Sequence, residues 1–437
     1  GEEERRYVHF QYPKWQADVY DRESGLKMAL PQADVIAYAK EYGNLLISKK
    51  EVLISTLITY ETHHVANDEF NRTIDVLQHL EENKDFFKDT IDKVISFLPI
   101  NQPLYALTCF ALIPGLMAQE VFVRPPVITH ALFARLAAVL DLEQFFPHVH
   151  ISFQERRSFI EEHRNTAGKT AVIFTGKPEN AFAVHKQFGE KVLFIGNGSS
   201  HNPVIVAETA DLNLAVAGVI EVQLYNQGGD CAAPNAILVA EAVYEDFLAR
   251  LRKSLRDIKT GSFSDPEVMV GPFHDPKHFR AIRAFLAEEQ TWLDPLAPIR
   301  IEENNLLIGP AIILKPLVEG GNYKELYAPI FFIQKYGRDI ELASYFDGSR
   351  YALHAGYITV YGESFYIMNL TDISPLHPPE SVIYNTHLHA FGVERGVKPY
   401  GGHGINSSFV IFKDRYHVGP TLPQRDIFNF FIKDKEP

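Results

Sequence analysis

Apolar residues recur at helical spacing through the first part of the chain. Within residues 32–48 and 50–80 they lie three and four positions apart, with charged residues between them. This spacing predicts amphipathic helices over both segments. At residues 93–98 the pattern changes to a short run with β-branched and aromatic residues that ends at Pro99, which predicts a strand.

From residue 120 onward, short apolar runs alternate with amphipathic segments. Strands that alternate with helices in this way are typical of crossover units in a parallel sheet. Ligands of such sheets bind outside the carboxyl ends of the strands. The predicted strands are residues 120–123, 148–153, 170–174 and 191–195, and the predicted helices are residues 129–140, 154–163 and 179–188.

A second unit of the same kind follows Pro203. The change in spacing there predicts a domain boundary, so we expect an α/β protein with two α/β domains. In this unit the predicted helices are residues 211–224, 243–258 and 339–346, and the predicted strands are residues 236–240, 311–314, 330–334, 357–361 and 381–384.

Composition and charge narrow the function classes. The chain has 437 residues with 42 basic and 55 acidic side chains, a net charge of −13, and this acidity disfavours nucleic acid as a partner. Residues 1–6 lack the apolar core of a signal peptide, and the apolar stretch 104–117 is too short to span a membrane. Two cysteines, Cys109 and Cys231, do not make a disulfide framework. We expect a cytoplasmic protein without a membrane partner.

Several candidate motifs fail in their context. Residues 168–170 (G-K-T) end like a phosphate-binding loop, but a strand follows where that motif requires a helix. Two His-x-His pairs occur, His148 with His150 and His387 with His389, and such pairs share one face of a strand. No acidic or cysteine ligand lies at a supporting spacing, so we predict no metal site.

Cys231 has the more reactive surroundings of the two cysteines. It follows the polar turn 226–230 (N-Q-G-G-D), in which two glycines leave backbone N–H groups free to face an anion. Cys109 lies among apolar residues. From its context alone, Cys231 is either a structural thiol or a nucleophile.

Five segments resemble, in the same order along the chain, motifs of the aldehyde dehydrogenase superfamily. The resemblance runs from about residue 94 to about residue 405. The pairs are residues 99–103 (P-I-N-Q-P) with P-W-N-x-P, 174–179 (F-T-G-K-P-E) with F-T-G-S-x-E, 226–231 (N-Q-G-G-D-C) with N-Q-G-Q-x-C, 325–329 (E-L-Y-A-P) with E-I-F-G-P, and 399–402 (P-Y-G-G) with P-F-G-G.

The resemblance implies the fold and the domains. A Rossmann-like NAD(P)-binding domain with a helical N-terminal part is expected at residues 1–202, and a catalytic domain at residues 203–405. Residues 406–437 are expected to return to the cofactor domain or to an oligomer interface. The short stretch at residues 82–94 leaves little room for the hairpin through which family members assemble, but a homodimer or higher homo-oligomer is still expected.

The resemblance also implies a mechanism. Cys231 would attack the carbonyl carbon of a small aldehyde to give a thiohemiacetal, and hydride transfer to NAD or NADP would leave a thioester. The Asn101 amide and the Cys231 backbone N–H would stabilise the oxyanion. The residues implied for the cofactor are Glu325 at the nicotinamide ribose, Gly176 and Lys177 at the pyrophosphate, and Pro99 and Tyr327 within the same motifs.

The chain departs from the family pattern at the hydrolytic general base. Asn197, 231 − 197 = 34 residues before the cysteine, takes the place of a glutamate, and residues 191–207 contain no carboxylate. An amide does not accept a proton near pH 7, so hydrolysis of the thioester loses roughly 10²–10⁴-fold. Coenzyme A is then an alternative acyl acceptor, His201 or a water held by Glu179 is an alternative base, and a binding or regulatory protein with slow turnover is the rival interpretation.

A second departure concerns the cofactor. The family's K-P-x-E segment corresponds here to residues 124–127 (R-P-P-V), so Val127 replaces the glutamate that repels a 2′-phosphate. Arg124 has the geometry to pair with that phosphate through two hydrogen bonds. We therefore expect NADP to be accepted.

Overall fold

Helices α2 (Gln32–Ser48), α3 (Lys50–Leu57) and α4 (His63–Gln78) form the N-terminal part of the described structure. The apolar spacing predicted a single helical stretch over residues 50–80. It is broken because Thr62 starts a new helix, its side chain accepting a hydrogen bond from the N–H of Val65. The computed structural model describes residues 32–87, 90–165, 167–198, 201–317, 324–346, 359–362, 408–413, 415–418 and 431.

The first sheet has the strand order β14-β13-β5-β4-β1-β2-β3. The five strands from β5 to β3 are parallel, and β13 and β14 form an antiparallel edge beside β5. The order of the crossovers reverses between β1 and β4, which opens a crevice at their carboxyl ends. The strands are β1 (Ile91–Phe97), β2 (Ala118–Arg124), β3 (Val149–Ile151), β4 (Thr170–Thr175), β5 (Leu193–Asn197), β13 (Ser408–Phe412) and β14 (Arg415–Val418).

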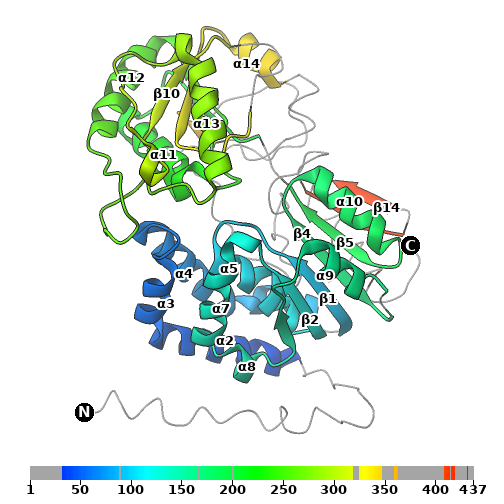
Figure 1. Cartoon of the computed structure of the whole chain (residues 1–437). Coiled ribbons are helices and arrows are strands. Elements are labelled where there is room, and N and C mark those ends of the chain that lie inside the picture. Colours follow the sequence, from blue (N-terminus) through cyan, green and yellow to red (C-terminus); the bar gives the residue numbers. More distant parts are fainter. Residues whose placement is uncertain are drawn as a thin grey trace, which may run out of the picture.

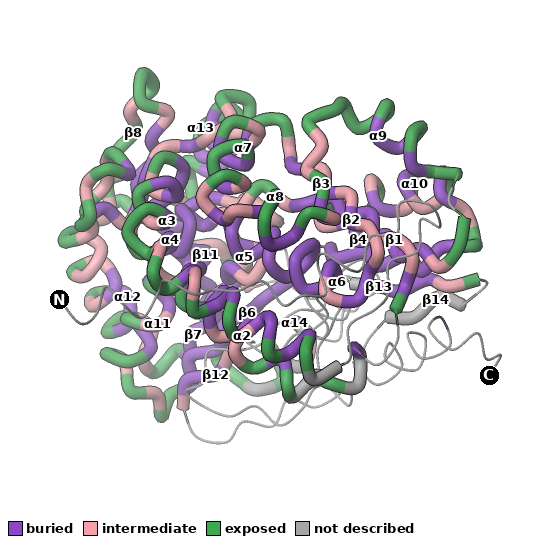
Figure 2. Tube along the Cα trace, turned by 90° about the horizontal axis from the view of Figure 1, so that it is seen from below, coloured by how far each residue is buried: buried purple, intermediate pink, exposed green. Residues whose placement is uncertain are grey.

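Both faces of this sheet are covered by helices (Figures 1 and 2). Val94 and Ile173 pack with the N-terminal helices, whereas Ile95 and Val172 pack toward α9 and α10 on the opposite face. Neighbouring residues of a strand point to opposite faces, which explains the continuous apolar runs of the sequence. The remaining helices of this part are α5 (Pro103–Leu107), α6 (Ile113–Gly115), α7 (His130–Val139), α8 (Leu142–Phe145), α9 (Arg156–His163) and α10 (Pro178–Phe188).

The second sheet has the strand order β10-β11-β7-β6-β12 and is parallel throughout. Helices α11 and α12 pack on one face and α13 on the other. The strands are β6 (Pro203–Val206), β7 (Ala236–Ala240), β10 (Ala311–Leu314), β11 (Ile330–Tyr336) and β12 (Thr359–Tyr361), with a separate pair β8 (Ile301–Glu302) and β9 (Leu307–Ile308). The helices are α11 (Leu212–Leu224), α12 (Glu241–Arg256), α13 (Pro276–Glu288) and α14 (Asp339–Phe346).

Strand β6, helix α13 and the two-residue strands β8 and β9 of the second unit were not predicted from the sequence. Strand β6 begins at Pro203, the residue predicted as the domain boundary. The start of helix α13 is marked by capping residues and not by apolar spacing. Asp275 accepts a hydrogen bond from the N–H of Lys277, and Pro276 occupies the first turn. The strand predicted at residues 381–384 lies outside the described residues, as do residues 399–402 and the pair His387/His389.

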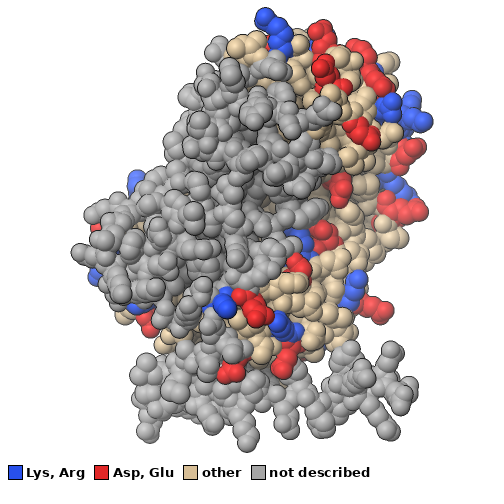
Figure 3. All heavy atoms as spheres, turned by 180° about the vertical axis from the view of Figure 1, so that it is seen from behind, with Lys and Arg blue, Asp and Glu red and all other residues tan. Residues whose placement is uncertain are grey.

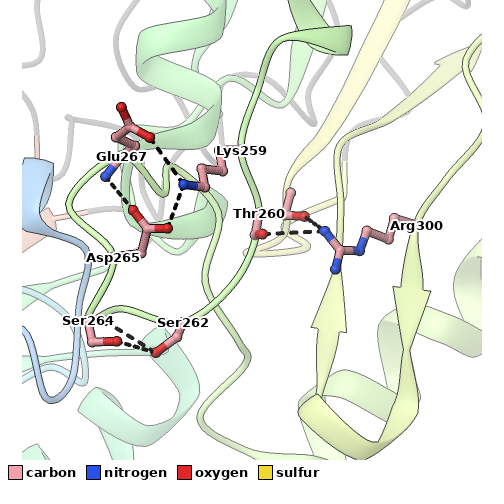
Figure 4. A network of polar contacts seen from close by, with 7 residues as sticks. All are labelled: Lys259, Thr260, Ser262, Ser264, Asp265, Glu267 and Arg300. Carbon is pink, nitrogen blue, oxygen red and sulfur yellow. Dashed lines mark hydrogen bonds and ion pairs between the residues drawn. The ribbon is translucent and has the colours of Figure 1, made fainter.

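Residues 257–275 form a loop between α12 and α13 that reaches the N-terminal helices. Within it, Lys259 pairs with Asp265 and Glu267, while Arg300 donates a hydrogen bond to Thr260 (Figure 4). At its end the His274 ring stacks on Tyr60, with ring centroids 3.8 Å apart and planes at 4°. The loop therefore joins the part of the chain that carries the second sheet to the part that carries the first.

The stacked histidine predicts a sensitivity to acid. Burial lowers the pKa of His274 from 6.5 to about 4, so the unfolded chain binds a proton more readily than the folded one as pH falls below 6.5. Up to about 3 kcal/mol of stability is lost between pH 6.5 and pH 4 through this group. Replacing it in His274→Phe keeps the ring stack and removes the titration, so the free energy of unfolding should fall less over that range.

Chemical denaturation of the native protein and His274→Phe at a series of pH values between 4 and 7 measures this difference. Leu296→Phe, at an exposed position that carries no titrating group, is the control and should keep the native pH dependence. Parallel curves for native and His274→Phe would contradict the interpretation.

Candidate functional site

A strained turn leads from α11 to Cys231. Asn226 and Gln227 have φ values of 52° and 55°, in the left-handed region that costs non-glycine residues about 1–3 kcal/mol each. Gly228 follows with φ 77°, and a Cβ there would lie 2.1 Å from the carbonyl oxygen of Ala328. This close approach requires glycine and seats the turn against the segment before β11.

Two asparagines from different sheets hold the cysteine segment. Asn101, which follows β1, donates from Nδ2 to the Gly229 carbonyl oxygen at 3.1 Å. Asn202, just before β6, donates from Nδ2 to the carbonyl oxygens of Cys231 at 2.7 Å and Ala233 at 3.3 Å. The carboxyl edge of the first sheet therefore meets the amino edge of the second at Cys231.

Cys231 opens into a pocket between its own segment and residues 324–332. Glu325 and Tyr327 line the same pocket, and the Tyr327 hydroxyl donates to Glu325 Oε1 at 3.3 Å. Three residues singled out in the sequence thus come together here, with Asn101 next to them through Gly229. The full lining is Gln223, Gly228, Asp230, Cys231, Ala233, Pro234, Asn235, Lys324, Glu325, Leu326, Tyr327, Ala328, Ile330 and Phe332.

Asn197 is placed at the carboxyl end of β5, buried beside β4. Its side-chain Nδ2 donates to Thr175 Oγ1 at 3.3 Å, and its backbone carbonyl oxygen accepts the Gly176 N–H at 2.9 Å. The side chain is 2% exposed. The amide thus joins the neighbouring strand ends, and Gly176 and Lys177 lie exposed just beyond them.

The two alternative bases considered from the sequence are placed differently. His201 is buried and its Nε2 is hydrogen-bonded to the Tyr345 hydroxyl of α14. Glu179 is exposed in the first turn of α10. Pro99 lies in the loop after β1, two residues before Asn101.

Arg124 ends β2 at the outer part of the same edge. Its Nε donates to the Gln154 carbonyl oxygen at 3.1 Å, which draws it toward the start of α9. Burial, together with the positive charge of Arg156, lowers the pKa of Arg124. Val127 and Phe153 are 64% and 46% exposed near these arginines, after β2 and β3.

Several residues around Cys231 were missed by sequence reasoning. Asn202 was not distinguished from a loop residue, and Gln102 and Asp230 occupy the variable positions of the two motifs, which carried no expectation. Arg72 sits on an amphipathic helix, where charged residues usually face solvent. The one available signal was that Arg72 falls among apolar positions of α4, on its buried face.

Two buried glutamates lie beneath the Asn101 segment. Glu69 Oε1 accepts the Leu104 N–H at 3.3 Å, whereas Glu69 Oε2 and both oxygens of Glu61 are buried without a hydrogen-bond partner in the described structure. Burial raises the pKa of Glu69 to about 7, and burial plus the negative charge of Glu69 raises the pKa of Glu61 well above its usual range.

Among the described residues, no three His, Cys, Asp or Glu side chains lie close enough together to hold a metal ion. His148 and His150 turn to different partners, the Gly115 carbonyl oxygen at 2.5 Å and Glu120 Oε2 at 2.6 Å. No described helix is long and apolar enough to cross a bilayer. On the face seen in Figure 3, charged side chains of both signs are interspersed.

Comparison with known proteins decides the family. The profile of the aldehyde dehydrogenase family matches residues 50–370. The chain belongs to the aldehyde dehydrogenase family. The resemblance inferred from the five motifs and the α/β fold that it implied are both confirmed.

Related proteins cover parts of this aldehyde dehydrogenase family chain. The NADP/NAD-dependent aldehyde dehydrogenase PuuC of Escherichia coli is 24% identical over 277 residues, 61% of this chain and 55% of that protein. An N-succinylglutamate 5-semialdehyde dehydrogenase of Legionella pneumophila is 28% identical over 197 residues, 43% of this chain and 39% of that protein. The chain spans about half the length of these curated relatives, or less.

Solved structures of the family share the fold. Gox0499 superposes with a TM-score of 0.67 at 19% identity, covering 80% of this chain and 79% of that one. The glyceraldehyde-3-phosphate dehydrogenase GapN of Methanocaldococcus jannaschii, complexed with NADP, superposes with a TM-score of 0.65 at 17% identity, covering 77% of each chain. At these identities the likeness establishes the fold.

The buried glutamate pair predicts how stability changes with pH. Because the folded-state pKa of both carboxyl groups is raised, their contribution to stability is complete below about pH 4.5 and is lost as pH rises through 7. The shift of Glu69 alone, from 4.5 to about 7, corresponds to about 3 kcal/mol. Glu61→Gln removes one of the two titrating groups and the negative charge that it places beside Glu69, so stability should fall less between pH 5 and pH 8.

Thermal unfolding at these two pH values compares the native protein, Glu61→Gln and Glu51→Gln, an exposed control on α3. The native protein and the control should lose equal stability, and Glu61→Gln should lose less. A Glu61→Gln variant with the full native loss would rule out Glu61 as a source of this pH dependence.

Proposed function

We propose that this protein is an NAD(P)-dependent oxidoreductase that acts on an aldehyde through a covalent intermediate at Cys231. Support comes from the junction of the two sheets, where Asn101 approaches the cysteine segment and Glu325 and Tyr327 share its pocket. This junction is the observation that carries the proposal. It brings a thiol, an amide donor and a carboxylate together beside a crevice suited to a dinucleotide.

The described residues fit a dinucleotide cofactor. Arg124, Arg156 and Lys177 place positive charge along the carboxyl edge of the first sheet, and the exposed Val127 and Phe153 offer apolar surface near the arginines. Such a set suits phosphates and an adenine ring. When bound, NAD or NADP supplies the hydride acceptor.

The protein's own groups have two tasks in the reaction. Cys231 attacks the aldehyde carbonyl carbon, so the S–C bond forms and the carbonyl oxygen becomes an oxyanion. The Cys231 backbone N–H and the Asn101 amide stabilise that oxyanion. For this task the Asn101 amide must turn from the Gly229 carbonyl oxygen or be shared with it, because the bond to Gly229 now uses one of its two N–H groups.

Transfer of the acyl group to coenzyme A is the second candidate function. Asn197 stands where hydrolytic members have a base, and its amide is engaged with Thr175. A thiol acceptor does not need a base to the degree that water does, since a thiol has a lower pKa than water. Assembly of two or more copies and a cytoplasmic location stay predictions.

Mass spectrometry of the cysteine peptides tests the function. Incubation with an aldehyde panel and NAD+ or NADP+, followed by an acid quench, should leave an acyl group on Cys231 of the native protein. Cys231→Ser should stay unmodified, and Cys109→Ala, which alters the fully buried cysteine, should acylate like the native protein. Addition of coenzyme A should clear the adduct faster than buffer alone, by roughly 10²-fold or more.

Each outcome separates the candidates. Clearance at equal rates with and without coenzyme A would favour hydrolysis and contradict acyl transfer. A native protein that forms no adduct with any aldehyde would overturn the enzymatic proposal and favour a binding or regulatory protein.

The cofactor proposal gives a second test, in Arg124→Ala. Loss of the guanidinium should weaken NADP+ binding by about tenfold or more, because a charged hydrogen bond contributes roughly 1.5–3 kcal/mol, and should leave NAD+ binding nearly unchanged. Isothermal titration with each nucleotide measures both constants. Arg157→Ala, which removes an exposed arginine paired with Glu161, is the control. Equal losses for both nucleotides would contradict a 2′-phosphate contact.

A further inference from the structure

A buried chain of polar contacts runs from α4 to the residue before Cys231. Arg72 donates from Nε to Asp68 at 3.1 Å, from Nη2 to the Tyr225 hydroxyl at 3.1 Å, and from Nη2 to Gln102 Oε1. Gln102 in turn donates from Nε2 to Asp230 Oδ2 at 2.5 Å. The arginine is 9% exposed, so this positive charge lies inside the protein beneath the site.

Asp230 is fixed at both carboxylate oxygens. Oδ2 accepts from Gln102, and Oδ1 accepts the Ala232 N–H at 2.7 Å. Asp230 is 7% exposed, and it lines the same pocket as Cys231. The Cys231 thiol donates a hydrogen bond to the Asp230 carboxyl group. The thiol and a held carboxylate are therefore in direct contact.

The surroundings of Asp230 affect its basicity in two ways. Burial raises the pKa of its carboxyl group above the usual value, while the Ala232 N–H and the charge of Arg72 limit the rise. A carboxylate with a raised pKa is a better proton acceptor than one in water. Position 197 carries an amide in place of a carboxylate, whereas the carboxyl group of Asp230 contacts the Cys231 thiol.

The pairing belongs to this chain's own sequence. Gln102 and Asp230 occupy the variable positions in the motifs P-I-N-Q-P and N-Q-G-G-D-C. Gln102 has φ 51°, a left-handed conformation that directs its amide between Arg72 and Asp230 at a cost of about 1–3 kcal/mol. Such strain persists where the surrounding contacts fix it, and here those contacts are Arg72 and Asp230.

We propose that Asp230 accepts the thiol proton of Cys231 during attack on the aldehyde, and that Arg72 is a positioning residue that holds Asp230 through Gln102. This inference rests on the proposed nucleophilic role of Cys231. It identifies a proton acceptor for acylation, a step distinct from the thioester hydrolysis that the Asn197 substitution affects.

The Cys231 sulfur forms a bond to the carbonyl carbon as the S–H bond breaks, and the proton moves to an Asp230 oxygen, leaving the oxyanion of a thiohemiacetal. Loss of hydride from that carbon to NAD(P)+ restores the C=O bond as a thioester. When an acceptor thiolate later attacks the acyl carbon, its S–C bond forms as the bond to Cys231 breaks, and Asp230 returns its proton to the departing sulfur.

The same contact predicts opposite changes in two reactions of Cys231. A negative carboxylate beside a thiol disfavours the thiolate, so its removal in Asp230→Asn should speed alkylation by iodoacetamide at pH 7 by about tenfold. Acylation by aldehyde should slow by roughly 10²-fold, because no proton acceptor remains. A residue that only maintains the fold would change both rates in one direction.

Other charges near the pair enter the pH dependence. Among the described residues these are Arg72 and Asp68 from α4, Tyr225 from the turn before Cys231, and Lys324 and Glu325 from the facing pocket wall. These groups are unchanged in every variant below, apart from Arg72 in Arg72→Lys. Differences between variants therefore report the altered group.

The experiment uses the full chain carrying Cys109→Ala, so that Cys231 is the single cysteine. Alkylation by iodoacetamide and the pre-steady-state burst of NAD(P)H are measured from pH 6 to pH 9 in this parent, Asp230→Asn, Asp230→Glu, Arg72→Lys and Gln102→Leu. Asp246→Asn, which removes an exposed carboxylate on α12, is the control. Circular dichroism checks that each variant folds.

The expected results differ for each variant. The parent burst rate should be nearly flat from pH 6 to pH 8, whereas in Asp230→Asn it should rise about tenfold per pH unit as the thiolate forms. Asp230→Glu should restore part of the burst. Gln102→Leu and Arg72→Lys leave the carboxylate in place, so they should slow the burst without the tenfold gain in alkylation.

Three outcomes overturn the proposal. Equal alkylation rates in the parent and Asp230→Asn exclude the electrostatic contact, and an unchanged burst excludes the proton transfer. If Asp230→Asn does not fold, a Gln102→Leu variant with the parent's burst rate overturns the positioning chain. A parent that forms no acyl group at Cys231 overturns the proposed function itself, which the iodoacetamide arm separates from a failure of the Asp230 contact.

Discussion

The arrangement around Cys231 depends on the buried charge of Arg72. A guanidinium taken out of water is tolerated only where it is paired and hydrogen-bonded, and the partners here come from three separate segments: Asp68 on its own helix, Gln102 after β1, and Tyr225 after α11. The stacked Tyr105 ring lies 4.3 Å from the guanidinium carbon. These segments therefore have to fold against one another for the charge to be compensated.

That requirement explains how a strained turn persists beside the pocket. Asn226, Gln227 and Gln102 all adopt left-handed backbone conformations that would relax in isolation. Asn101 and Asn202 hold the far side of the same segment through its carbonyl oxygens. The cost of the strained residues is offset by contacts from both sheets, which places the thiol at the junction rather than within either sheet.

The sequence predicted the elements far better than the polar contacts among them. Helix α2 and strand β7 have the predicted bounds, because apolar spacing reports burial directly. The motifs placed Cys231, Glu325 and Tyr327, which do share one pocket. By contrast, Gln102 and Asp230 are hydrogen-bonded to each other although they lie 128 residues apart in sequence. Nothing in the local sequence around either residue indicates this pairing. The burial of Arg72 depends on how α4 packs against the rest of the protein, so the sequence did not indicate it either.

We propose that the crevice of the first sheet holds a dinucleotide whose nicotinamide ring reaches Cys231. A crystal structure of the full chain grown with NADP+ would locate the cofactor. We expect the adenosine phosphate beside Arg124, the pyrophosphate beside Gly176 and Lys177, and the nicotinamide ring in the pocket between Cys231 and Glu325. A dinucleotide bound elsewhere, or a nicotinamide ring outside that pocket, would show that this arrangement is wrong.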